Sequence, residues 1–154
     1  MALGDIRERI AAILASVGGV GRVHQYLRLA ENRDVFYTLF THEKADGGKE
    51  VNAWMVTRKK TPSERGPMQV VHRDHYMQLH GLRQVQDAQA SELVFQQTVE
   101  AIQNKFDSEF TLGGLAINSG PVQVLVVEHR SFGGVLCHAA ELEYRVRERV
   151  TYTL

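Results

Sequence analysis

The stretch that decides the fold is LEYRVRERVTYTL, residues 142–154, in which apolar and polar side chains alternate. Only Glu148 interrupts the apolar series, which comprises Leu142, Tyr144, Val146, Val150, Tyr152 and Leu154. The opposite series consists of Glu141, Glu143, Arg145, Arg147, Arg149, Thr151 and Thr153. Because successive strand side chains point to opposite faces, this period predicts a strand with one face on a core. The other face lies in water or against a charged partner.

The same strand extends back to Val135, which makes it longer than a domain of this size is wide. Extended residues 135–154 would span roughly 65 Å, whereas a compact domain of this length is about 40 Å across. The strand must therefore bend or project, and we expect a bulge near Ala139 and Ala140. Two endings stay open: residues 150–154 reach a neighbouring subunit, or the strand bends and its terminus frays.

Two amphipathic helices flank the other strands. The first is expected over residues 5–17 and ends at Gly18 and Gly19, and the second over residues 88–106 with Asp87 as its N-cap. A short helix over residues 33–42 is capped by Asn32 or Asp34. The apolar stripe of the first helix comprises Ile6, Ile10, Ile13, Leu14 and Val17.

Four further strands are expected, over residues 20–26, 50–60, 69–82 and 122–129. The last of these is apolar on both faces, which predicts a central strand covered on both sides, and the final strand returns antiparallel to it. We therefore predict an α+β fold of one domain, residues 1–154. A mostly antiparallel or mixed sheet of about five strands carries two main helices on one face, with a short extra helix.

Composition excludes several classes of protein. The 154 residues include 18 basic and 18 acidic side chains, and this zero net charge argues against a dedicated nucleic-acid binder. Cys137 is the only cysteine, so no intrachain disulfide framework is expected. The sequence lacks an apolar run of membrane-spanning length and a signal-peptide pattern, which predicts a soluble chain made in a cytoplasm.

No convincing catalytic constellation is present. His72, Asp74 and His80 fall on one face of an extended strand, so a small metal-dependent enzyme is the alternative from a different class. Zinc sites need three or four convergent ligands, and this spacing supports one weakly. Cys137 is better explained as a small buried apolar residue than as a nucleophile. We expect no catalytic residue, no metal and no cofactor.

Several stretches in combination resemble the tail terminator, or tail completion, family of lambda-like bacteriophages. The opening helix is followed by GGVGRVHQY at residues 18–26, which is similar to the glycine-rich strand entry of that family. Residues 34–40 with VNAWMVTR at residues 51–58 resemble its short helix and tryptophan-bearing strand. SFGGVLCH at residues 131–138 resembles its last hairpin, and residues 107–121 are unmatched.

The resemblance implies a structural virion protein at the head-proximal end of the tail, and no enzymatic activity. It would form a homo-oligomeric ring, in the family a hexamer, that caps the tail tube, ends its polymerisation and joins the tail to the neck. Its partners would be further copies of itself, the tail tube protein and a neck or head-completion protein. DNA would pass through the lumen without sequence-specific binding. Another connector, neck or tail-tube ring protein is the alternative within this class.

Two surfaces are candidates for these contacts. The charged face of the final strand runs from acidic to basic, so parallel copies in register would oppose like charges and this face should meet a different surface. The candidate interface residues are Glu141, Glu143, Arg145, Arg147, Arg149, Tyr152 and Leu154. The candidate lumen or partner loop contains Arg58, Lys59, Lys60 and Arg65, although a solvated loop also explains this basic run.

Overall fold

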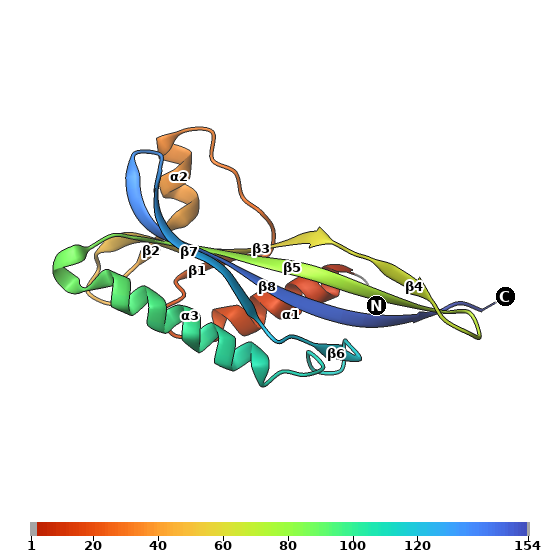
Figure 1. The fold of residues 1–154 in the computed structure, drawn as a ribbon. Coiled ribbons are helices and arrows are strands. Elements are labelled where there is room, and N and C mark those ends of the chain that lie inside the picture. Colours follow the sequence, from red (N-terminus) through yellow and green to blue (C-terminus); the bar gives the residue numbers. More distant parts are fainter. Residues whose placement is uncertain (1–2, 154) are drawn as a thin grey trace.

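A computed structural model describes residues 3–153 and confirms the α+β fold (Figure 1). The first half of the chain contains α1 (Leu3–Ala15), β1 (Arg22–His24), α2 (Arg33–Phe40), β2 (Thr41–Glu43), β3 (Lys49–Lys60) and β4 (Ser63–Arg65). The second half contains β5 (Val70–Gln84), the 3-10 helix η1 (Asp87–Gln89), α3 (Ser91–Asp107), β6 (Asn118–Ser119), β7 (Gln123–Phe132) and β8 (Val135–Thr151).

The final strand, β8, is an interior strand of the mixed sheet. The strands follow the order β1, β3, β5, β8, with β6 and β7 both paired to the outer edge of β8. Among residues 3–153, only the pairing of β1 with β3 is parallel. The register of β5 and β8 is unbroken from Val70 opposite Thr151 to Gln84 opposite Cys137. The prediction of a bulge near Ala139 and Ala140 is wrong. The break in the β7–β8 register lies instead in β7, between Val124 and Val126.

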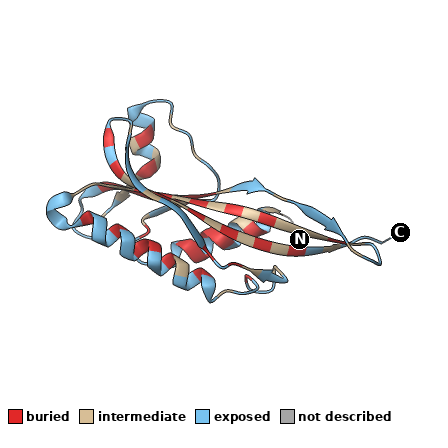
Figure 2. Ribbon diagram, viewed as in Figure 1, coloured by how far each residue is buried: buried red, intermediate tan, exposed pale blue. Residues whose placement is uncertain are grey.

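Helices α1 and α3 cover one face of this sheet, as the periodicity predicts (Figures 1 and 2). Their apolar stripes meet the inward side chains of β3, β5 and β8 in one buried cluster. The apolar face of β8 supplies Leu142, Tyr144 and Val146, all completely buried. Fully burying each large apolar side chain contributes roughly 1.5–3 kcal/mol before conformational entropy is subtracted.

Helix α2 lies on the opposite face of the sheet, at one end only. The Asn32 side chain caps it by accepting a hydrogen bond from the Val35 N–H at 3.0 Å. A second buried cluster forms beneath it and contains Phe36, Phe40, Val51, Ala53, Met55, Leu82, Val135 and Cys137. This contact explains why the start of β8 is apolar on the face that later becomes charged.

Two expectations about local structure are wrong. Strand β7 is an exposed edge strand and not a central one, because no strand pairs with its outer edge among residues 3–153. Its apolar run, Val124 to Val127, is therefore largely open to solvent. Asp87 does not cap α3, because it begins the separate turn η1. Ala90, in the left-handed region with φ of 54°, then precedes the first residue of α3, Ser91.

The long strands project from the core at one end of the sheet and bend at the other end. The sheet narrows to an arm, residues 61–75 and 146–152, made from β4, the start of β5 and the end of β8. Val146 at its base still packs in the core, and its tip extends beyond α1 and α3 (Figure 1). At the other end, the β7–β8 hairpin curls toward α2 (Figure 1). The arm and the α2 lobe thus lie at opposite ends of one continuous sheet.

Candidate functional site

A polar face covers β5 and β8 on the side away from α1 and α3. Helix α2 reaches only the end of this face near Leu82. Most of its side chains are partly exposed, and Arg149 is exposed. The polar face consists of His72, Asp74, Tyr76, Gln78 and His80 from β5 and of Glu141, Glu143, Arg145, Arg147 and Arg149 from β8.

Opposite charges are paired across the strands of the polar face. Asp74 lies between Arg145 and Arg147, with N–O distances of 3.3 Å to each. Glu141 lies 3.8 Å from His80, whose pKa is lowered because burial disfavours the charged ring. Such part-exposed pairs are worth only about 0–1 kcal/mol each. Their charges therefore stay available to a partner that approaches this face.

The predicted basic loop adjoins the polar face. Arg58, Lys59 and Lys60 are exposed at the end of β3. Lys59 lies 3.9 Å from Glu143, and the Lys60 ammonium lies 4.7 Å from the centre of the Tyr76 ring. The structure thus brings the two surfaces predicted from the sequence together as one continuous surface.

The remaining predicted residues lie on or near the arm. Arg65 is exposed on β4. The Tyr152 hydroxyl accepts a hydrogen bond from Arg73 at 2.8 Å, and the Tyr152 N–H donates to the Gln69 carbonyl at 3.0 Å. These bonds tie the end of the chain to β5. Leu154 lies outside the described residues.

A buried polar network inside the arm explains why Glu148 interrupts the apolar series. His75 Nε2 lies 2.9 Å from Glu148 Oε1, and His75 Nδ1 lies 3.0 Å from Thr61 Oγ1. The His75 and Glu148 side chains are only 4% and 2% exposed. The hydroxyl, imidazole and carboxylate are the groups of a catalytic triad, but a substrate cannot reach a ring buried this deeply. The network instead joins β5, β8 and the short link between β3 and β4 that contains Thr61.

The candidate metal ligands do not converge. His72, Asp74 and His80 share the polar face, as predicted, but Asp74 pairs with two arginines and His80 with Glu141. Within residues 3–153, no group of three His, Cys, Asp or Glu side chains could hold a metal ion. Cys137 is completely buried, and burial raises the pKa of its thiol to about 12, so it is not a reactive nucleophile.

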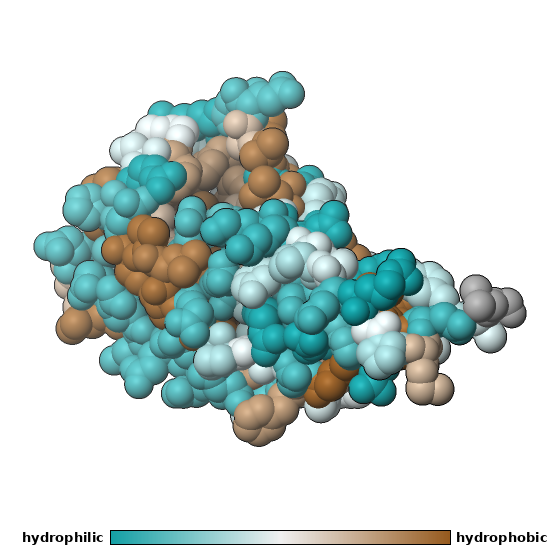
Figure 3. Space-filling model, turned by 45° about the vertical axis from the view of Figure 1, so that its right-hand side comes forward, coloured by the Kyte–Doolittle hydropathy of each residue, from teal (hydrophilic) through white to brown (hydrophobic). Residues whose placement is uncertain are grey.

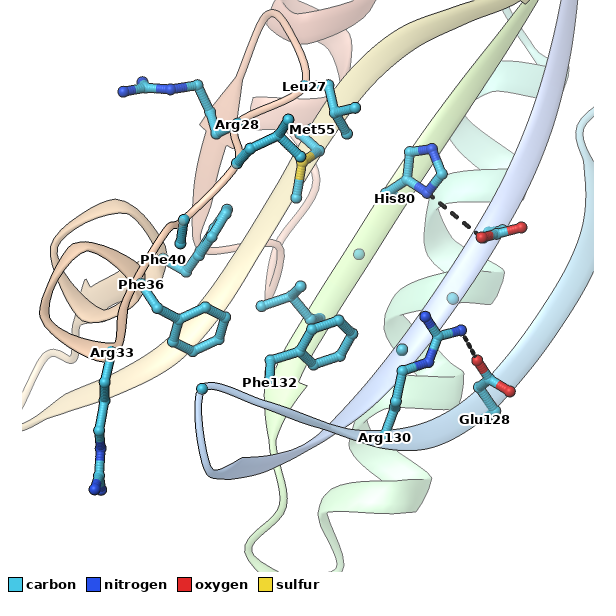
Figure 4. A pocket seen from close by; sticks show the side chains of 18 of the residues that line it. Leu27, Arg28, Arg33, Phe36, Phe40, Met55, His80, Glu128, Arg130 and Phe132 are labelled. Carbon is cyan, nitrogen blue, oxygen red and sulfur yellow. Dashed lines mark hydrogen bonds and ion pairs between the residues drawn. The ribbon is translucent and has the colours of Figure 1, made fainter.

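An apolar pocket that the sequence analysis missed opens beside the polar face. It has a volume of about 520 Å³ and lies between the sheet, α2 with the loop before it, and the β7–β8 hairpin (Figure 4). Phe36 and Phe132 stack within it, with centroids 6.2 Å apart. His80 and Glu141 belong both to its lining and to the polar face.

Hydrophobic side chains line the hollow beneath the α2 lobe, and a second hydrophobic patch lies at the left centre of the same view, with hydrophilic residues between the two (Figure 3). The pocket was not foreseen because its walls come from segments about a hundred residues apart, around Leu27 to Arg33 and Val126 to Gly133. One sequence signal was available. Leu27 and Leu29 lie in an irregular loop where no helical or strand periodicity accounts for them.

Comparison with known proteins adds no family. Neither a protein-family profile nor a curated protein matches this chain. Among the described helices, none has the length and apolar character needed to cross a membrane.

Proposed function

We propose that this chain is a structural protein of a bacteriophage tail, a tail terminator. It assembles into a closed ring that caps the tail tube, stops its polymerisation and joins the tail to the neck. The observation that carries the proposal is the arm, together with the uncovered polar face beside it. Strands that extend past the core of their own domain are well placed to contact a neighbouring subunit.

Head-to-tail assembly fits this shape. A ring needs two different surfaces on each subunit, so that one copy contacts the next and the series closes. The arm and the α2 lobe are unlike surfaces at opposite ends of one sheet (Figure 1). Zero net charge removes a long-range repulsion between copies. The resemblance of residues 18–26, 51–58 and 131–138 to the terminator family supports the same assignment.

The test is arrest of tube growth. Tail tube protein from the same phage would be polymerised with and without the purified chain, and tube lengths would be measured by electron microscopy. A terminator gives short tubes that carry a cap at one end, and added tube protein does not extend them.

Other roles give different results in this assay. A tube component would be incorporated along the length of the tube, and a neck protein would leave the length distribution unchanged. Either result would overturn the terminator role.

A further inference from the structure

We propose that the tip of the arm, with Met68 at its end, inserts into the apolar pocket beside α2 of a second copy of this chain. This contact would be the seam of the ring, so the inference rests on the proposed function. Three features carry it: the conformation of the tip, the distance between tip and pocket, and the charges around each.

The arm ends in an exposed turn of unusual conformation. Met68 is 88% exposed, and both Met68 and Gln69 adopt left-handed backbone conformations with φ of 58° and 62°. The Gly66 N–H donates to the Val70 carbonyl at 2.7 Å and closes the turn. Glycine or asparagine is favoured where a hairpin turn needs two positive φ values, so methionine and glutamine are costly choices here. The chain therefore holds a large apolar side chain in solvent at the cost of backbone strain.

The pocket offers the environment that this side chain lacks. Its lining includes the apolar side chains of Leu27, Leu29, Phe36, Phe40, Met55, Leu82 and Phe132. Its volume, about 520 Å³, is several times that of one methionine side chain, so the neighbouring Pro67 can enter as well. Methionine suits such a site because its flexible thioether adapts to irregular apolar surfaces and contacts aromatic rings favourably.

The arm cannot fill the pocket of its own chain. Val70 begins β5 at the arm and Leu82 lies near its other end at the pocket, and twelve strand residues span about 40 Å. The contact must therefore join two molecules. Because tip and pocket are different surfaces at opposite ends of the molecule, repeated contacts give a ring or an open filament.

Unpaired charges around the two surfaces are complementary. Next to the tip, Glu64 and Arg65 form no ion pair among residues 3–153. At the rim of the pocket the same holds for Arg28 and Glu31, and the Arg28 side chain points outward (Figure 4). An arm seated in the pocket could place Glu64 against Arg28 and Arg65 against Glu31. A second copy thus offers charges complementary to those at the rim of the pocket.

The experiment uses two full-length variants that each damage one surface. Met68→Asp changes the tip and leaves the pocket intact, whereas Leu29→Asp changes the pocket rim and leaves the tip intact. Both positions are highly exposed, at 88% and 78%, so the monomer should fold. Leu93→Asp, at a 61% exposed position on α3, is the matched control. Circular dichroism checks the fold, and native mass spectrometry measures assembly.

Each tip or pocket variant alone should be monomeric at concentrations at which the unchanged chain and Leu93→Asp form rings. Loss of one buried methionine should raise the concentration needed for assembly by tenfold or more. A mixture of Met68→Asp and Leu29→Asp should give dimers of one copy each and nothing larger, because only one sound tip and one sound pocket remain.

Rings formed by Met68→Asp, or a mixture that stays monomeric, would overturn the tip-in-pocket contact while leaving the ring itself intact. An unchanged chain that stays monomeric at every concentration would overturn both the contact and the proposed function.

Discussion

At the scale of single residues, Gly81 is the glycine with the least room for a side chain, because the Trp54 ring packs directly against it. The two residues are opposite each other on β3 and β5. A Cβ atom on Gly81 would lie 2.2 Å from Trp54 Cε2, and Trp54 is completely buried. The Trp54 ring also stacks on Phe95 of α3, with centroids 6.1 Å apart. Glycine at position 81 therefore leaves the space that the Trp54 ring fills, and this ring is in turn the surface on which Phe95 of α3 packs.

Gly81→Ala should lower the free energy of unfolding by about 1–3 kcal/mol, since a well-packed core accommodates an added methyl group only by shifting its neighbours. Urea denaturation measures this. Gly18→Ala is the control, because a Cβ atom there has nothing within 4 Å. Equal stability of the two variants would show that Trp54 is less tightly held than its contacts indicate.

The buried His24 makes stability depend on pH. Its Nε2 lies 2.7 Å from the Leu39 carbonyl oxygen, and burial lowers its pKa below the ordinary 6.5. Below pH 6.5 the unfolded chain therefore binds a proton that the folded chain resists. The free energy of unfolding should fall as the pH drops from 6.5 toward the lower pKa of the folded state.

Denaturation at pH 7.5 and 5.5 checks this dependence. His24→Gln, which keeps an N–H donor but does not titrate, should lose less stability between the two values. Burial also lowers the pKa of His80 and His138, so some dependence should remain in the variant. A variant that loses as much stability as the unchanged chain would rule out His24 as the cause.

At the scale of the elements, the arm depends on the buried pair of His75 and Glu148. His75→Phe would remove the hydrogen bond to the buried Glu148 carboxylate and leave it only the 3.8 Å contact with Arg73, at a cost of about 1–3 kcal/mol. The double variant His75→Phe with Glu148→Leu should regain most of that stability, because replacing both partners of a buried hydrogen bond by apolar groups of similar shape is often nearly neutral. Thermal unfolding of both variants measures the difference. A double variant as unstable as the single one would show that the pair itself is needed.

The sequence predicted the elements whose periodicity is strong. The alternation of residues 142–154 identified β8 and its buried face. The stripe of α1 was correct except for Val17, which lies just past the end of the helix. Strand β7 was misplaced because an apolar run on both faces does not reveal whether a neighbouring strand is present. The start of α3 was misplaced because Asp87 is a good capping residue that here begins a different turn.

At the scale of the whole molecule, the candidate surface was only partly predictable. The charged positions of β8 and the basic loop follow from the sequence, but their junction through Lys59 and Glu143 requires the fold. The pocket and the strained tip depend on contacts and backbone angles that no local pattern encodes.

The polar face itself can be tested by charge reversal. Arg145→Glu with Arg147→Glu should raise the concentration needed for assembly about tenfold and leave the monomer folded, because a partner surface would meet the wrong charge. Asp74 would then face two carboxylates, so some stability should also be lost. Adding Asp74→Arg restores opposite charges across the strands and should recover the stability but not the assembly. If the charge-reversed variant formed rings at the same concentration as the unchanged chain, the polar face would not be part of the interface.

The central claim is that copies of this chain close into a ring. Native mass spectrometry of the purified full-length chain, with negative-stain images of the same sample, tests it most directly. The account predicts one dominant closed oligomer, together with images of rings that have a central hole as wide as a tail tube. A monomer at all concentrations, or an open ladder of oligomers without rings, would contradict it.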